Sequence, residues 1–143
     1  MSKIEIVEEY RGHCGYTYIF PVRNINASAK RYSYEQNWDR IIGVFFCDIN
    51  GFLLQSLNRN IDPQIQFFGN VKCDYPDYYE EFGQNFFSKE AVKAVIQDLH
   101  DELAINSAGH SATEIDFYRR LAEKLQATLS SAEQYEYILF LGP

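Results

Sequence analysis

Residues 73–87 read Cys73-Asp-Tyr-Pro-Asp-Tyr-Tyr-Glu-Glu-Phe-Gly-Gln-Asn-Phe-Phe87, and this stretch divides the chain into two halves of different pattern. The residues before it contain short alternating or β-branched runs bounded by turn residues, which is typical of strands. The residues after it place apolar side chains three and four positions apart, which is typical of amphipathic helices. The sequence therefore predicts strands in the first half and helices in the second.

Five short segments of the first half have strand character: residues 3–10, 16–22, 41–47, 52–57 and 64–68. The run 41–47 is apolar at nearly every position, so we expect it to be covered on both faces and central in the sheet. Asn50 and Gly51 after it favour a tight hairpin turn, which would make 52–57 its antiparallel partner. The first half thus predicts an antiparallel meander.

Two amphipathic helices are expected after residues 73–87. Ser88 is a suitable N-cap for the first, whose apolar side is formed by Ala91, Val92, Val95, Ile96, Leu99 and Leu103. Ser111 and Glu114 fit a capping box at the start of the second. Its apolar face is formed by Phe117, Tyr118, Leu121, Ala122, Leu125 and Leu129. The link at 106–110 is short enough for an antiparallel helical hairpin.

Apolar segments on both sides of the helices complete the expected fold. We expect Phe82, Phe86 and Phe87 to turn into the core ahead of the first helix, and residues 135–141 to insert into the sheet as its last strand. A chain of 143 residues has the size of one domain and can bury one hydrophobic core. The sequence therefore predicts a single α+β domain over residues 1–143, with a mostly antiparallel sheet of about five or six strands and two helices packed on one face.

The composition indicates a folded protein of a reducing compartment. Hydrophobic residues make up 46% and aromatic residues 16% of the chain, which excludes a disordered protein. The three cysteines form no Cys-x-x-Cys pair, and the N-terminal residues lack the apolar run of a signal peptide. No apolar run approaches the roughly 20 residues of a membrane-spanning helix. We therefore expect a soluble, cytoplasmic protein that does not contact membranes.

The net charge of −7 is distributed unevenly along the chain. Residues 1–72 hold eight basic and seven acidic side chains, whereas residues 73–143 hold five basic and thirteen acidic ones. Such an acidic excess repels nucleic acid and anionic membranes and attracts basic partners. We therefore expect a basic protein partner and no nucleic acid partner. The plain alternative is that the acidic surface only keeps the protein soluble.

The sequence contains no motif for catalysis, a cofactor or a metal. His13 and Cys14 are adjacent, but neighbouring residues on a strand point to opposite faces, which disfavours a nucleophile pair. The histidines and cysteines show no paired metal-ligand spacing, and both phosphate-loop patterns are missing. We expect no catalytic residue, no cofactor and no metal. A small hydrolase with a site assembled from scattered polar residues stays open as an alternative.

Residues 23–39 are polar without a clear period and predict a long surface loop, which could include a helical turn at residues 34–38. Basic and aromatic side chains are interleaved between residues 23 and 40, a composition that could stack on single-stranded RNA. Glu35 and Asp39 dilute the basic charge, and the acidic field of the whole molecule opposes such binding. The role of this segment stays open.

The candidate binding surface is the acidic and aromatic part of the opening stretch. It contains four carboxylates, three tyrosines and no basic residue: Asp74, Tyr75, Asp77, Tyr78, Tyr79, Glu80 and Glu81. Each tyrosine lies beside a carboxylate, which keeps this backbone near water, and a tyrosine that fills a partner's pocket often contributes about 2 kcal/mol or more. Asp98, Asp101 and Glu102 lie on one flank of the first helix and could extend this surface. The alternative is a solvated connection between sheet and helices.

This combination of size, acidity and surface chemistry resembles the immunity proteins that bacteria make against their own nuclease toxins, in particular those of contact-dependent growth inhibition. The resemblance is carried by residues 74–81, with Asp98, Asp101 and Glu102 in a wider surface. In such proteins the acidic face imitates the phosphates that the basic cleft of the toxin holds. The resemblance implies a non-enzymatic inhibitor that masks a basic nuclease domain. A DNA mimic or adaptor protein is a further alternative.

Overall fold

The fold is taken from a computed structural model, in which the described residues are 6–7, 15–34, 42–45, 52–67, 83–131 and 135–142. They form six strands: β1 (Ile6–Val7), β2 (Tyr16–Asn26), β3 (Arg31–Tyr34), β4 (Ile42–Phe45), β5 (Gln84–Ser88) and β6 (Tyr137–Leu141). They also form three α-helices: α1 (Phe52–Asn60), α2 (Lys89–Ile105) and α3 (Ala112–Ser131). Two short 3₁₀ helices lie in the connections: η2 (Pro63–Ile65) and η3 (Ser107–Gly109).

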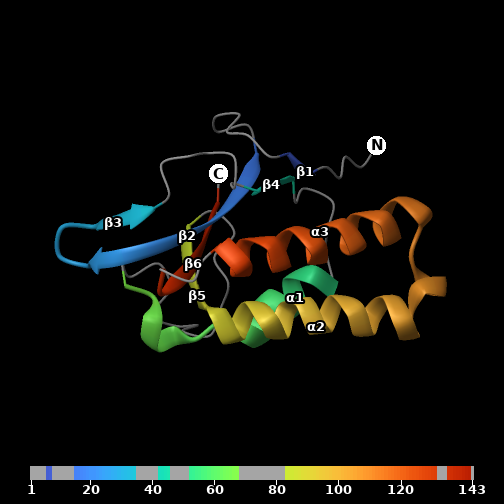
Figure 1. The fold of residues 1–143 in the computed structure, drawn as a ribbon. Helices are drawn as coiled ribbons and strands as arrows, with labels where there is room; N and C mark the ends of the chain where they lie inside the picture. Colours follow the sequence, from blue (N-terminus) through green and yellow to red (C-terminus); the bar gives the residue numbers. More distant parts are fainter. Residues whose placement is uncertain are drawn as a thin grey trace.

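One antiparallel sheet contains all six strands, in the order β1-β4-β2-β6-β5 with β3 beside β2 (Figure 1). β2 lies at the centre of the sheet. β6 pairs with residues 18–22 along one of its edges, while β4 and β3 follow one another along the other edge, at residues 16–19 and 22–26. The C-terminal strand β6 lies between β2 and β5, as its apolar sequence predicts. The α+β fold with a mostly antiparallel sheet is confirmed.

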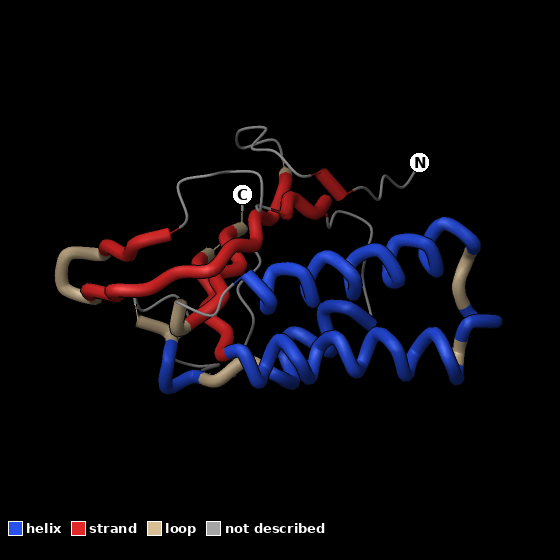
Figure 2. Tube along the Cα trace, in the orientation of Figure 1, coloured by secondary structure: helices blue, strands red, loops and turns tan. Residues whose placement is uncertain are grey.

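Both faces of the sheet are apolar, because successive side chains of a strand point to opposite faces. The face toward the helices includes Ile19, Val44, Phe87, Ile138 and Phe140. The opposite face is rich in aromatic side chains and includes Tyr16, Tyr18, Phe20, Val22, Phe86 and Leu139. In Figure 2 the helical layer, in blue, lies beside the strands, in red. The helices therefore cover one face of the sheet, as expected.

α2 and α3 form the expected helical hairpin. Every apolar residue assigned to α3 is buried, and Val92, Val95, Ile96 and Leu99 of α2 are buried as well. The Ser88 Oγ accepts a hydrogen bond of 3.1 Å from the Ala91 N–H and caps α2. Ser111 and Glu114 form the predicted capping box through hydrogen bonds of 3.1 and 3.0 Å. The helical half of the sequence prediction is thus confirmed.

The expected strand at residues 52–57 is wrong, because these residues belong to helix α1. Leu53, Leu57 and Ile61 are buried and recur every four residues, which places them on one side of a helix. β4 pairs instead with β1 and β2, so it is an interior strand but has no hairpin partner in residues 52–57. Asn50 and Gly51, the expected hairpin turn, lie outside the described residues. Helix α1, which the sequence did not predict, therefore replaces a strand of the predicted meander.

The expected strand at residues 64–68 is wrong as well. Pro63 fits the first position of a helical turn, and the Asp62 carboxylate caps η2 by accepting from the Gln64 N–H at 2.9 Å. Gln66 and Phe67 follow without joining the sheet, and residue 68 lies outside the described residues. A strand that the pattern did not predict, β5, pairs with β6 instead.

The expected surface loop at residues 23–39 is, in its described part, a β-hairpin. β2 continues to Asn26, residues 27–30 form the turn, and β3 returns antiparallel to β2. Asn24 and Lys30 adopt left-handed backbone conformations, with φ of 54° and 53°, where the register shifts and where the turn ends. Figure 1 shows this hairpin projecting beyond the rest of the sheet, away from the helices. Residues 35–39, including most of the possible helical turn, lie outside the described residues.

The remaining expectations concern the phenylalanines before α2 and membrane contact. Phe86 and Phe87 are fully buried, as expected, but they lie on strand β5 and point to opposite faces of the sheet. Phe82 lies outside the described residues.

Among the described helices, none combines the length and the hydropathy needed to cross a bilayer.

Candidate partner-binding surface

The seven residues of the acidic stretch, Asp74, Tyr75, Asp77, Tyr78, Tyr79, Glu80 and Glu81, lie outside the described residues. The described residues on both sides of this stretch belong to the same part of the fold. Phe67 packs edge-to-face on Phe86 and Tyr137, with ring centroids 5.3 and 5.1 Å apart. The Gly83 carbonyl accepts a hydrogen bond of 2.8 Å from the Gly142 N–H. The acidic stretch therefore leaves and rejoins the described fold at the β5–β6 end of the sheet.

Asp98 of α2 is used inside the fold as the anchor of α1. Its Oδ2 accepts hydrogen bonds from the Ser56 hydroxyl at 2.7 Å, from Arg59 at 2.7 Å and from the Asn60 amide at 3.0 Å. Partial burial alone would raise the pKa of Asp98, but the hydrogen bonds from Arg59, Ser56 and Asn60 outweigh it, so the pKa lies below its ordinary value. Three donors of α1 thus tie this helix to Asp98 of α2.

Glu102, one helical turn after Asp98 on α2, is also used inside the fold. Its two oxygens accept from the Asn106 amide at 2.8 Å and contact the His110 Nε2 at 2.7 Å. The other ring nitrogen of His110 lies 3.6 Å from Glu114 of α3. The side chains of His110 and Glu102 are only 13% and 14% exposed. The imidazole therefore links the carboxylates of two helices at the turn of the helical hairpin.

This cluster shifts the pKa values of its members in opposite directions. The hydrogen bond that the Glu102 carboxylate accepts from His110 raises the pKa of His110 against the effect of burial. Hydrogen bonds from Asn106 and His110 lower the pKa of Glu102, and hydrogen bonds from Ser111 lower that of Glu114. Burial, with the nearby carboxylates, raises the pKa of Tyr118 to about 12, and its ring packs edge-to-face on His110. The cluster favours a protonated imidazole between two carboxylates.

Asp101 differs from its two neighbours on α2. Its side chain is exposed and accepts a hydrogen bond of 2.8 Å from Gln97, one turn earlier on the same helix. Of the three helix carboxylates in the predicted surface, Asp101 alone thus faces solvent without bridging to another element. The acidic flank of α2 is not a continuous surface.

The described residues as a whole carry no acidic excess. They contain nine Asp or Glu and nine Lys or Arg residues. The net charge of −7 therefore belongs to the other residues of the chain, and residues 68–82 hold four acidic side chains and one basic one among them. The charge that would attract a basic partner is therefore concentrated outside the described helices and strands, in part at residues 68–82.

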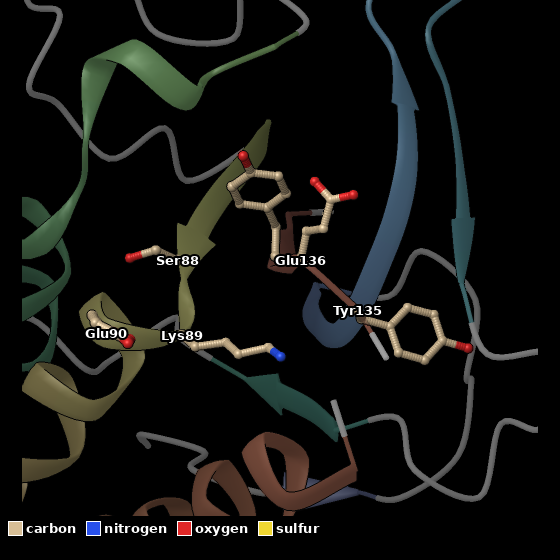
Figure 3. Close-up of a pocket in the computed structure, with 6 residues that line it drawn as sticks. Ser88, Lys89, Glu90, Tyr135 and Glu136 are labelled. Carbon is tan, nitrogen blue, oxygen red and sulfur yellow. The ribbon is translucent and has the colours of Figure 1, made fainter. Parts of the chain in front are cut away.

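A shallow hollow of about 430 Å³ lies where α2 and β6 begin. It is lined by Ser88, Lys89, Glu90, Tyr135, Glu136 and Tyr137. Figure 3 shows Ser88 and Glu90 on the side of α2, Tyr135 and Glu136 on the side of β6, and Lys89 extending between them. The Arg23 guanidinium lies 5.1 Å from the centroid of the Tyr135 ring, at the rim of this region. The described lining contains no histidine.

Sequence reasoning missed the role of His110. Its relation to Glu114, four residues later, fits one turn of a helix, but Glu102 lies eight residues earlier in another helix. Only the hairpin turn brings the three side chains together. Within the described residues, no group of His, Cys, Asp and Glu side chains is arranged to hold a metal ion.

Comparisons with known proteins found no relationship. No family model matches the chain, and no similar sequence among the curated proteins and no similar fold among the solved structures was found.

Proposed function

We propose that this chain is a non-enzymatic binding protein, specifically an immunity protein that neutralises a nuclease toxin by masking the basic surface of the toxin. The masking face consists of the acidic and tyrosine-rich residues 74–81. The protein acts in the bacterial cytoplasm, a reducing compartment that three cysteines without a Cys-x-x-Cys pair favour.

The observation that carries this proposal is that the acidic excess of the chain lies outside the described helices and strands. The described residues are balanced in charge, whereas residues 74–81 place four carboxylates and three tyrosines within eight positions. Acidic side chains accelerate association with a basic surface by roughly 10–10³-fold. Tyrosines provide large contact areas at a low cost in conformational entropy. A steering charge combined with aromatic contacts is the composition of a recognition segment.

The fold gives this segment a rigid support. Phe67 before it packs on β5 and β6, and Gly83 after it is hydrogen-bonded to Gly142. Both contacts are with the sheet, whose strands β5 and β6 are buried in the core. A recognition loop on a rigid scaffold loses less entropy on binding than a loop on a mobile one.

The structure narrows the proposed surface on α2. Asp98 is bound by three donors of α1, and Glu102 is bound by Asn106 and His110. A carboxylate that is satisfied within the fold has less to gain from a basic partner, because binding would exchange one contact for another. We therefore assign the energetic centre to residues 74–81, with Asp101 as a solvent-exposed neighbour on the helix.

The hydrolase alternative is less well supported by the arrangement of the described groups. The cluster of His110, Glu102 and Glu114, whose pKa values are shifted, lies beside the C-terminal end of α2, whereas the hollow lies at the beginning of this helix. α2 has 17 residues, which separates its ends by about 25 Å at ~1.5 Å per residue. A general acid or base needs to be within hydrogen-bond reach of its substrate, and these groups face each other instead.

The test is a pull-down from the native cell with the tagged protein, followed by a nuclease assay on the purified partner. We expect a basic protein whose nuclease activity is abolished by an equimolar amount of this chain. A captured partner without a basic surface, or nuclease activity that persists with the chain in excess, would show that the proposal is wrong.

A further inference from the structure

The β-hairpin formed by residues 22–34, here called the arm, has a charge unlike that of the rest of the molecule. Its charged residues are Arg23, Lys30 and Arg31, all of them exposed, and it contains no Asp or Glu. Its other exposed side chains are short and polar or methyl groups: Asn24, Asn26, Ala27, Ser28 and Ala29. The arm is therefore a cationic element on an acidic protein.

The two cations at the tip of the arm are available for an external contact. Neither Lys30 nor Arg31 forms a side-chain ion pair within the part of the chain that the structure describes. Arg23, at the base, stacks over Tyr135 instead of pairing with a carboxylate. Cations that serve stability alone are usually placed beside a carboxylate or a helix C-terminus, and these are not.

Lys30 occupies a backbone position that does not favour lysine. Its φ is 53°, in the left-handed region, and its N–H closes the turn by donating to the Ala27 carbonyl at 3.3 Å. Glycine adopts this conformation without strain, whereas a side chain with a Cβ is disfavoured there. Strained residues of this kind gather at functional sites. The choice of a long cationic side chain at this position indicates a role for its charge.

The arm extends beyond the part of the sheet in which β2 pairs with β6. Val22 is the last residue of β2 that pairs with β6, and β2 continues for four more residues to Asn26. At ~3.4 Å per residue the arm extends about 14 Å beyond this pairing. The Debye length at physiological ionic strength is about 8 Å, so the described charges beside this pairing, such as that of Glu136, are largely screened at the tip.

We propose that the arm is a second binding site, separate from residues 74–81, for the phosphate backbone of a nucleic acid. Lys, Arg, Asn and Ser are the side chains that usually contact phosphates, and they make up the exposed surface of the arm with Ala27 and Ala29. A two-stranded ribbon also fits the major groove of a duplex. Protein interfaces instead need large anchors such as Trp or Tyr, and the exposed residues that the structure describes at the tip of the arm, 26–31, include none.

The test is the binding of fluorescein-labelled DNA and RNA duplexes of about 20 base pairs, measured by anisotropy with the full-length protein at about 50 mM NaCl. With three phosphates neutralised, the affinity should fall about 40-fold between 50 and 200 mM NaCl. The double variant Lys30→Glu and Arg31→Glu should weaken binding by more than about tenfold and reduce the salt slope by about 2. A preference for DNA or RNA would identify the natural polyanion.

The matched control is the double variant Lys93→Glu and Arg120→Glu, which makes the same change in net charge on exposed positions of α2 and α3. It should bind like the wild type. Lys30→Gly keeps the turn, removes one cation and should reduce the salt slope by about 1. The proposal is overturned by undetectable binding at millimolar protein, by equal losses in both double variants, or by tighter binding to a polyglutamate peptide than to either duplex.

Discussion

At the scale of single residues, His110 gives the fold its response to pH. Because its pKa is raised in the fold, its contribution to stability is complete below about pH 6.5 and is lost as the pH rises through the raised value. Because the pKa values of Glu102 and Glu114 are lowered, their contribution is complete above about pH 4.5 and is lost as the pH falls through the lowered values. All three contributions coincide between about pH 4.5 and 6.5.

The replacement His110→Gln should therefore lower the free energy of unfolding at pH 5.5 by about 1 kcal/mol, since the charge-assisted contacts to both carboxylates are lost. Thermal unfolding at several pH values measures this effect. The wild type should lose stability between pH 5.5 and 8, and the variant should lose less. His100→Gln, at an exposed position of α2, is the control and should keep the wild-type profile. A variant His110→Gln with that same profile would contradict the role of the cluster.

The strain at Lys30 leads to a second prediction at this scale. Lys30→Gly should raise the free energy of unfolding by about 0.5–1 kcal/mol, because glycine adopts the left-handed conformation without a steric cost. Urea denaturation measures the change. Ser28→Gly, in the same exposed turn but at a position without a left-handed backbone, should be neutral or destabilising. A loss of stability in Lys30→Gly would show that the backbone there is not strained.

At the scale of elements, Gln66 protects the outer edge of the sheet. Its side-chain amide accepts from the Phe86 N–H at 2.9 Å and donates to the Phe86 carbonyl at 3.0 Å, as a neighbouring strand would do. Among the described strands, β5 is the last on this side of the sheet, and open strand edges promote association between chains. One side chain from the connection after α1 thus closes the edge at its centre.

Gln66→Ala should destabilise the fold by about 1–2 kcal/mol, because it leaves two half-buried backbone groups of Phe86 without their partners. Hydrogen exchange of the Phe86 amide should accelerate, and the variant should aggregate more readily. Gln64→Ala changes an exposed side chain of η2 and serves as the control. Equal exchange rates at Phe86 in both variants would refute the protective contact.

The success of sequence reasoning differed between elements for physical reasons. α2 and α3 were predictable because their caps and apolar faces are local patterns that tertiary contacts reinforce. α1 was not, because Phe52, Leu53 and Leu54 are adjacent and apolar, a run that fits a strand or a helix equally well. The arm was missed because a hairpin that projects from the sheet needs no apolar face. Strand β5 was missed because it is specified by its pairing with β6, more than 50 residues later in the chain. Asn85, for example, pairs with Phe140.

At the scale of the whole molecule, the described residues balance nine acidic against nine basic side chains, three of the basic ones in the arm, and residues 74–81 add a dense acidic segment. The acidic segment could be read directly from the sequence, since density of charge is a local property. The roles of Asp98 and Glu102 inside the fold could not be read from the sequence. Asp98 bonds to Ser56, 42 residues away, and Glu102 contacts His110 across the turn of the helical hairpin. Charge alone does not distinguish a carboxylate that recognises a partner from one that holds two helices together.

The measurement that tests the central claim most directly compares two triple charge reversals in their affinity for the captured basic partner. The first changes Asp77, Glu80 and Glu81 to Lys in the acidic stretch. The second changes the exposed residues Glu90, Glu123 and Glu136 to Lys, so that both proteins have the same net charge. The account predicts that the first variant loses at least about 100-fold in affinity and most of its salt dependence, while the second stays within about threefold of the wild type. Equal losses in the two variants, or an unchanged first variant, would contradict it.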